Sequence, residues 1–524
     1  MSSTTHTPAT GPAPLTGLDV FSSDRALVEG VERYADAGRL GEIRAELTAL
    51  GRAAGSARVL EWGAWAAACP PAPRDGGLDV HPAWRRLLRR GATAVPSDAR
   101  PRPDGALRRT AALLVWAQVE AGHCLSLSST HAVAAALRAE SGPVDAVDST
   151  DTVDLVGTAG SSAAIAVGTD GVRAEPAPGG TEHFLTGRVR LRPAVLADVL
   201  LVRAWTPAGP VPLLAPCAPP EGRGGPRVHP PADAAPSRPG PPAAEVEFDG
   251  TVRGRRIGAE GRGPAVAAAV TEALRSDRVT VSAAVLRQAV VRAVHHVAHH
   301  GGHDGRALPP GEEASVRNVL ADLAVEAEAA GALALRLAAA RDGGTDRDRA
   351  LLRVAVPAAA HLLVGRCAPA AAEALDLLGG DGCAGGPGVP ALPHGAPPDP
   401  TGEDTGHRLA LEVLRVVRED PEALTAFLTE IGRARGADHR LDRAIRELLG
   451  ELAELEGIEA RARRVAERTA LVLQGALLVR HAPPEVADAF CASRLGGERG
   501  TVWGTLPPAL DLAAIVERAR PAVG

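Results

Sequence analysis

LDLLGGDGC, residues 375–383, ends a long apolar helical pattern, and GEDTGH, residues 402–407, opens the next helix. The first motif holds Gly379, Gly380 and Gly382, and glycines that follow a helix let backbone N–H groups approach a phosphate closely. The second motif places Glu403 just before a helix, where a carboxylate is well placed to act as a base. Either motif also occurs in ordinary loops, so both interpretations stay open at this point.

The composition around these motifs is typical of a large globular protein. The 524 residues are 45% hydrophobic and 23% charged, with a formal net charge of −6. A chain of this length can bury a large core and divide into several domains. The slight acidity argues against bulk, sequence-independent binding of nucleic acid. None of the 57 basic residues is lysine, a bias that a GC-rich genome explains better than chemistry does.

The cysteines and the N-terminus favour a cytoplasmic protein. Six cysteines are spread along the chain without a C-x-x-C pair, which excludes the common zinc modules and gives no disulfide framework. Residues 1–17 are rich in Ser, Thr and Pro and lack a signal pattern, so we expect a disordered N-terminus. We expect no membrane partner, because no apolar run approaches the ~20 residues that a membrane span needs.

Residues 18–150 show helical patterns and are predicted to form a helical N-terminal domain. Ser22-Ser23-Asp24 has the composition of an N-cap, and His81-Pro82 places a proline in the first turn of another helix. Further helices are predicted over 40–54, 56–68 and 106–124. We interpret Glu120, near the end of the last helix, as an exposed or capping carboxylate rather than a functional one.

The pattern changes between residues 151 and 250, where short β-like runs are separated by Gly- and Pro-rich turns. This pattern is typical of a small β-domain. Residues 219–242 are dense in Pro, Gly and Arg and are predicted to be a mobile loop. The predicted strands cover residues 152–156, 162–167, 183–185, 199–204 and 244–248.

Helical periodicity returns in residues 251–420, which are predicted to form a four-helix bundle with the glycine and Glu403 motifs at its end. The four predicted helices span 264–300, 312–342, 350–366 and 368–378. Residues 421–524 are predicted to add three or so helices, including 444–456 and another from Gly457 to about Val479. This tail holds 14 arginines against 15 carboxylates, which indicates salt-bridged helix faces rather than a nucleic-acid module.

Two polar clusters have alternative interpretations. His295, His296, His299, His300 and His303 include pairs at the i,i+4 spacing that can hold a metal. No acidic third ligand stands at a motif spacing, so we favour a solvated or partly packed cluster and predict no metal site.

The other cluster is Ser126, Ser128, Ser129 and Thr130 with His131, a set that suggests a hydrolase. No G-x-S-x-G turn surrounds it, so we predict a helix N-cap instead.

The order of these parts resembles the acyl-CoA dehydrogenase family, and more narrowly its AidB-type, alkylation-response branch, which carries an extra helical C-terminal domain. The likeness covers nearly the whole chain. The fold that it implies is mainly α with a small central β-domain. The stretches that carry the likeness most clearly are DVFSSDRAL (19–27), HPAW (81–84), AQVEAG (117–122), LADLAVEAEAA (320–330) and ADAFCASRLGG (487–497).

The resemblance implies a set of site residues. Glu403 matches the base that removes the α-proton of an acyl thioester, in a pattern that reads Trp-Glu-Gly-Ser-Gly-Asn in the branch. Thr405 matches the flavin-contacting Ser, and Gly406 the following Gly. The stretch 378–382, with Gly379, Gly380 and Gly382, matches a segment near the nucleotide part of FAD bound in a neighbouring subunit. Gly168 and Thr169 loosely match the Gly-Ser of the β-domain.

Four elements that face the flavin in the family differ here. Ala164-Ile165-Ala166-Val167 stands where Met-Thr-Glu is usual, and the Lys-Trp-Phe strand reads GRVRLR at 187–192. The Arg-x-x-Phe-Gly segment reads HGGHDG at 300–305, and Gly402 and Asp404 replace the Trp and Gly on either side of the base. These differences predict that FAD binding is weakened or lost.

Two functions follow as expectations. The first is a flavoenzyme that oxidises an acyl thioester or related substrate with Glu403 as base. The second is a degenerate, non-catalytic relative with a binding or regulatory role. The resemblance also implies a homodimer or homotetramer. It suggests an association with DNA as well, which the nearly neutral tail does not support.

Overall fold

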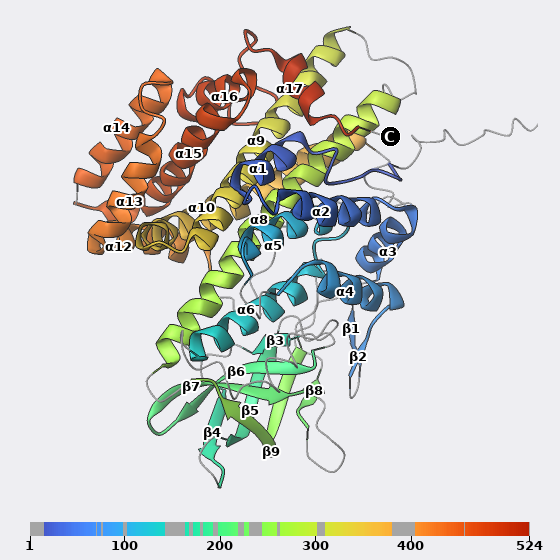
Figure 1. Cartoon of the computed structure of the whole chain (residues 1–524), viewed down its shortest axis with the longest axis vertical. Coiled ribbons are helices and arrows are strands. Elements are labelled where there is room, and N and C mark those ends of the chain that lie inside the picture. The colour runs from blue at the N-terminus through green and yellow to red at the C-terminus, as the bar shows by residue number, and fades with distance from the viewer. Residues whose placement is uncertain are drawn as a thin grey trace, which may run out of the picture.

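The computed structural model describes residues 15–69, 71–74, 77–97, 102–141, 163–166, 171–178, 182–191, 197–217, 225–229, 244–258, 262–300, 310–379, 404–454 and 456–522. Helices make up most of the molecule, and a small sheet lies at one end of it (Figure 1). The prediction of a mainly α protein with a small β-domain is confirmed.

The N-terminal helices begin largely where the sequence predicts. Asp24 is the N-cap of the first helix and accepts a hydrogen bond from the Leu27 N–H at 3.1 Å, and Pro82 opens the fourth helix. This part of the chain comprises α1 (Arg25–Tyr34), α2 (Leu40–Ala54), α3 (Ala57–Ala68), a hairpin of β1 (Ala72–Arg74) and β2 (Gly77–Asp79), α4 (Pro82–Ala94), α5 (Gly105–Trp116) and α6 (Cys124–Ser141).

The predicted helix over 106–124 is wrong in its second half. Helix α5 ends at Trp116, and a turn leads into α6 at Cys124. Glu120 lies in this turn and accepts hydrogen bonds from the N–H groups of Gly122 and His123 at 2.6 and 2.8 Å. Glu120 is therefore a largely buried carboxylate that closes the turn before α6, because its two N–H donors precede the helix. The apolar pattern runs through the turn because Ala117 and Val119 are buried although they are not helical.

A seven-stranded, mostly antiparallel sheet forms the β-domain, in the order β3-β5-β4-β6-β7-β9-β8. The predicted run 152–156 lies outside the described residues, and β4, β7 and β8 were not predicted. Strand β8 falls inside the predicted loop 219–242, where its three residues pair with β9. The strands are β3 (Ala163–Ala166), β4 (Val172–Pro176), β5 (Glu182–Leu191), β6 (Val199–Thr206), β7 (Gly209–Pro216), β8 (Arg227–His229) and β9 (Ala244–Arg256).

Three long helices follow the sheet: α8 (Gly263–His300), α9 (Pro310–Gly343) and α10 (Asp346–Leu378). The predicted division into 350–366 and 368–378 is wrong, because α10 runs unbroken through Pro357 and Pro369. Among the described residues, three helices rather than four therefore precede the glycine motif. The helix that follows Glu403, α12 (Gly406–Glu419), packs against α10.

Helix α10 is long and apolar enough to cross a membrane by length and composition alone. Of its most apolar window, 72% is buried inside the protein, where α8, α12 and α13 (Pro421–Gly432) pack against the helix. This burial is typical of the core helix of a globular protein. The packing also holds the two prolines within a helix that their local preference would break.

The C-terminal helices are more numerous than the sequence predicts, and they stand beside the bundle (Figure 1). After α13 the described residues form α14 (His439–Ala453), η1 (Ile458–Arg461), α15 (Ala462–His481), α16 (Pro484–Phe490), η2 (Cys491–Leu495) and α17 (Leu512–Ala519).

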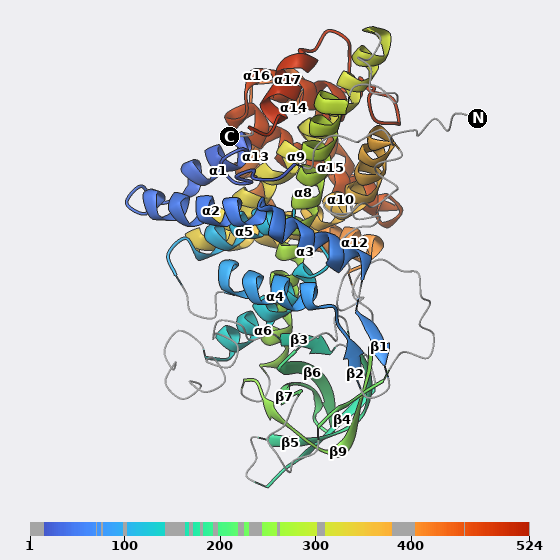
Figure 2. The same cartoon turned by 90° about the vertical axis from the view of Figure 1, so that its right-hand side faces the viewer.

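Three groups of buried apolar residues hold these parts together. The largest is continuous through the N-terminal helices, the bundle and the C-terminal helices. A second group joins α6 and the start of α8 to strands β3, β6 and β7, so it attaches the sheet to the helices. The third fills the β-domain with residues such as Leu185, Val246 and Phe248. Figure 2, which views the molecule after a 90° rotation, shows α6 between the sheet and the remaining helices.

Candidate functional site

Two arginines of α8 hold the residue that follows Glu403. The Nε of Arg275 lies 2.9 and 2.8 Å from the carboxylate oxygens of Asp404, and its Nη1 donates to Glu412 of α12 at 2.8 Å. Arg278 donates to the main-chain carbonyl of Asp404 at 3.0 Å. Both the side chain and the backbone of Asp404 are therefore fixed to α8 at the point where α12 begins.

This contact is largely removed from water. The side chains of Arg275 and Asp404 are 12% and 9% exposed. Burial alone would lower the pKa of the Arg275 guanidinium, but its hydrogen bonds to Asp404 and Glu412 outweigh burial and raise that pKa above its usual range. Asp404 stands where the related pattern has Gly, and the structure shows what the carboxylate does there: it pairs with α8.

The first turn of α12 carries two of the predicted site residues. Thr405 is the N-cap residue, and its hydroxyl lies 3.1 Å from Nδ1 of His407 instead of accepting from a helix N–H. Gly406 begins the helix next to His361 of α10, since a Cβ atom added at Gly406 would lie 3.7 Å from Nδ1 of His361. Two effects lower the pKa of His361: burial is the larger, and repulsion from Arg463 is the second. The imidazole is therefore neutral at pH 7.

The other predicted residues are only partly described. Gly379 ends α10 with φ +57°, and its N–H donates to the Asp376 carbonyl at 3.0 Å. A glycine suits this left-handed backbone. Helix α10 packs against α12. Gly379 therefore lies at the end of one helix, and Thr405 and Gly406 lie at the start of its neighbour. Glu403, Gly168, Thr169, Gly380 and Gly382 lie outside the described residues.

The strand that should lie beside the flavin offers a poor surface for it. In β5, Val189 is buried, while Arg188 and Arg190 are exposed and lie 3.2 and 3.9 Å from carboxylates of β9. Their charges are thus already balanced within the sheet. An isoalloxazine needs a stacking surface and free hydrogen-bond donors, and residues 187–191 provide neither an aromatic ring nor an unpaired guanidinium.

The serine and histidine segment is not an N-cap, so that prediction is wrong. Ser126 to His131 lie inside α6, and the hydroxyls of Ser129 and Thr130 donate to carbonyls four residues earlier. His131 lies 3.3 Å from the carboxylate of Asp277, which also pairs with Arg109. The segment serves packing between α5, α6 and α8.

Protonation states in this buried contact follow from its surroundings. Burial lowers the pKa of His131 to about 4, with Arg109 acting in the same direction, so the imidazole is neutral. Burial would raise the pKa of Asp277, but Arg109 and His131 outweigh it and lower that pKa well below its usual range. The Ser129 and Thr130 hydroxyls donate to carbonyls of α6, so neither is held with its proton toward His131 as a nucleophile would be.

The histidine cluster is partly packed, as the sequence indicates. His296 is buried at the end of α8, and the rings of His295 and His299 lie 4.3 Å apart. Across the described residues, no group of three His, Cys, Asp or Glu side chains is arranged to hold a metal. His303 lies outside those residues.

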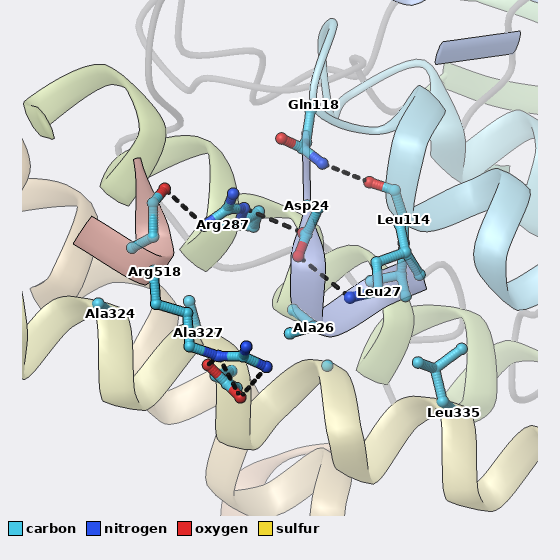
Figure 3. Close-up of a pocket in the computed structure, with 14 residues that line it drawn as sticks. Asp24, Ala26, Leu27, Leu114, Gln118, Arg287, Ala324, Ala327, Leu335 and Arg518 are labelled. Carbon is cyan, nitrogen blue, oxygen red and sulfur yellow. Dashed lines mark hydrogen bonds and ion pairs between the residues drawn. The ribbon is translucent and has the colours of Figure 1, made fainter. Parts of the chain in front are cut away.

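A separate pocket lies where α1, α8, α9 and α17 meet (Figure 3). Its volume of about 40 Å³ has room for a water molecule or two, whereas sites for cofactors usually span ~300–1,000 Å³. Its charges are paired: Arg287 lies 3.0 Å from Asp24, and Arg518 lies 2.9 Å from Glu328. We interpret it as a structural junction between the two ends of the chain, because none of the predicted site residues lines it.

Two family models match the chain. Residues 11–150 match the adaptive response protein AidB N-terminal domain, and residues 263–403 match the acyl-CoA dehydrogenase C-terminal domain. Together these stretches span more than half of the 524 residues. The chain is also 29% identical to AidB of Escherichia coli K12, over 95% of each chain.

Solved structures share the fold. Caenorhabditis elegans ACDH-11 in complex with C11-CoA superposes with a TM-score of 0.78 at 20% identity, over 94% of each chain. An acyl-CoA dehydrogenase complexed with FAD from Bacillus anthracis superposes with a TM-score of 0.56 at 12% identity, over 91% of this chain and 83% of that one. At these identities the likeness shows the fold alone.

Proposed function

Since the chain belongs to the acyl-CoA dehydrogenase family, in its AidB-type branch, we propose that it is an acyl-CoA dehydrogenase-like flavoprotein with weakened affinity for FAD. Its substrate would be an acyl thioester or a related compound. The anchoring of Asp404 by Arg275 and Arg278 is the observation that carries this proposal. It fixes the residue next to Glu403, and an accurately held base is what proton abstraction requires.

Glu403 would take the α-proton of the acyl thioester onto its carboxylate. FAD, when bound, supplies the acceptor for the hydride from the β-carbon. Arg275, Arg278 and the first turn of α12 would position Glu403 through Asp404, while Thr405 and Gly406 would offer polar groups at the same helix end. His361 is neutral beside Gly406, so it adds no positive charge that would lower the basicity of Glu403.

The weakened affinity is supported by strand β5. Losing one charge-assisted contact typically costs ~1.5–3 kcal/mol, so several lost contacts reduce affinity by orders of magnitude. Arg188 and Arg190 engage carboxylates of β9, and no aromatic residue occurs in 187–191. We therefore expect the protein to purify with substoichiometric flavin and to oxidise acyl-CoA slowly.

A visible spectrum tests this proposal, because bound flavin absorbs near ~450 nm. After titration with FAD and removal of unbound flavin by gel filtration, the protein should carry more of that absorbance, and dye reduction with an acyl-CoA should rise. Glu403→Gln should change little as purified but abolish the rate at saturating FAD. The matched control is Glu456→Gln, an exposed carboxylate in the C-terminal helical region, which should keep the rate.

The second candidate is a non-catalytic binding or regulatory protein, and the absence of a flavin surface on β5 favours it. It would be the correct one if saturating FAD produced neither flavin absorbance on the protein nor dye reduction. A DNA-binding role belongs to this second candidate, and a mobility shift with duplex DNA in ~0.15 M salt tests it.

We also propose a homodimer or homotetramer. The resemblance places residues 379–383 near FAD of a neighbouring subunit, so a shared site would need a second copy of the chain. Light scattering at micromolar concentration should give a mass at least twice that of the monomer. A monomer would contradict both the assembly and the shared site.

A further inference from the structure

The outer faces of α3 and α4 form a basic surface with tryptophans in it. Arg85, Arg86, Arg89 and Arg90 are all exposed on α4, and Arg58 is exposed on α3. Trp62 is half-buried between the two helices, with the guanidiniums of Arg58 and Arg86 5.3 and 5.6 Å from its ring centre. We call Arg58, Trp62, Trp65, Arg85, Arg86, Arg89 and Arg90 the α3–α4 surface; both helices lie toward the viewer in Figure 2.

The charge on this surface is not balanced. Glu61 is the one carboxylate in α3 and α4. Across the described part of the chain, none of the five arginines forms an ion pair with a carboxylate. In α2 and α5, by contrast, Arg44 pairs with Glu32 and Arg108 with Glu46. A net positive region on a chain of net charge −6 is a local feature that global composition hides.

The tryptophans distinguish between possible anionic partners. Trp65 is 46% exposed, and its ring stacks on His81 with centres 5.5 Å apart. His81 covers one face of the Trp65 ring, and two arginine guanidiniums lie over the Trp62 ring, which leaves a single open ring face on this surface. Proteins that hold nucleic-acid strands usually stack successive bases on several aromatic side chains. A bilayer surface needs something else: an amphipathic indole at headgroup level, surrounded by cations that reach lipid phosphates.

We infer that the α3–α4 surface is a peripheral docking site for anionic phospholipid bilayers. The arginines bind the lipid phosphates, and Trp65 sits among the headgroups. The expectation of no membrane partner was based on spanning segments, and a peripheral surface needs none. The apolar faces of α3 and α4 remain in the core, where Trp84 and Leu87 are buried, so the docking requires no unfolding.

Vesicle co-sedimentation of the full-length protein tests the inference. At ~0.1 M salt the protein should bind extruded vesicles of 70% phosphatidylcholine and 30% phosphatidylglycerol but not pure phosphatidylcholine, and ~0.5 M salt should release it. Each basic residue near such a surface contributes about a factor of five, so R85E/R89E should weaken binding by at least about 30-fold. W65A should weaken it less.

Matched variants separate this surface from general charge effects. R435E/R446E reverses two exposed arginines of the C-terminal helical region, and W205A removes a tryptophan that is 38% exposed on β6. Both should bind vesicles as the unaltered protein does. Circular dichroism should show that R85E/R89E keeps its helical content, because both side chains are exposed.

Four results would overturn the inference. One is that the unaltered protein binds neutral and anionic vesicles equally well, or binds neither kind. Another is equal loss of binding in R435E/R446E. The third is that the unaltered protein binds duplex or single-stranded DNA but not anionic vesicles, and that R85E/R89E no longer binds the DNA. This result would assign the surface to nucleic acid. A change of oligomeric state in R85E/R89E without vesicle binding by the parent protein would assign it to subunit contact.

Discussion

Replacing Arg275 with Gln should destabilise the protein by about 2–4 kcal/mol. The substitution leaves Asp404, which is 9% exposed, without the cation that offsets its burial, and it also removes the contact with Glu412. Removing one partner of a fully buried ion pair typically costs ~3–5 kcal/mol. We take a lower figure because Arg275 and Glu412 retain 12% and 29% exposure.

A double-mutant cycle isolates the contact. Asp404→Asn alone should lower the free energy of unfolding by about 2 kcal/mol. The double variant R275Q/D404N should cost at least ~1.5 kcal/mol less than the sum of the single changes, because it no longer buries the Asp404 carboxylate without its Arg275 partner. The control is Arg415→Gln in α12, the helix that carries Glu412. Its pair with Glu419 is 3.6 Å long and exposed on both sides, so the change should stay below ~0.5 kcal/mol.

The measurement is urea unfolding followed by far-UV circular dichroism at pH 7, with the shift of the midpoint read at constant slope. Strict additivity of R275Q and D404N would refute the reasoning. So would a change for R275Q no larger than that for R415Q. Either result would mean that Asp404 is not held by α8, and it would remove the main support for an anchored Glu403.

Three further predictions address other parts of the fold. The folded-state pKa of His131 is about 4 against an ordinary 6.5, so the stability that depends on its neutral ring is present above pH ~6.5 and lost as the pH falls toward 4, by up to about 3 kcal/mol. His131→Asn should flatten the dependence of the unfolding free energy on pH in that window, and the exposed His407→Asn should not. Trp84→Ala should cost about 3–5 kcal/mol in urea unfolding, because the ring is 2% exposed and its N–H donates to the Ala66 carbonyl at 2.8 Å; a cost below ~1 kcal/mol would contradict its place in the core. Pro369→Ala should stabilise the protein by ~1–3 kcal/mol, because α10 is continuous there and the new N–H can bond to the Gly365 carbonyl; no gain would favour the break in α10 that the sequence predicts.

The sequence by itself determined the class and the order of parts. Hydrophobic periodicity is a local property, so it marked α2 with its exact bounds and the N-cap at Asp24. The family likeness was equally readable, because it rests on strings such as DVFSSDRAL and LADLAVEAEAA that survive in the scaffold. Short strands such as β8 were missed, because a three-residue edge strand has no periodicity to detect.

Only the tertiary structure decided where helices break and which charges meet. Helix α10 continues through Pro357 and Pro369 because packing outweighs the local cost of proline, while α5 stops at Trp116 within an apolar run because the next residues are buried without being helical. Arg275 and Asp404 stand 129 positions apart, and nothing in either neighbourhood predicts their contact. The same holds for His361 beside Gly406 and for the arginines of α3 and α4, which form no ion pair with any carboxylate that the structure describes. Pairing depends on the distance between side chains in space, and a one-dimensional pattern carries that distance only for near neighbours along the chain.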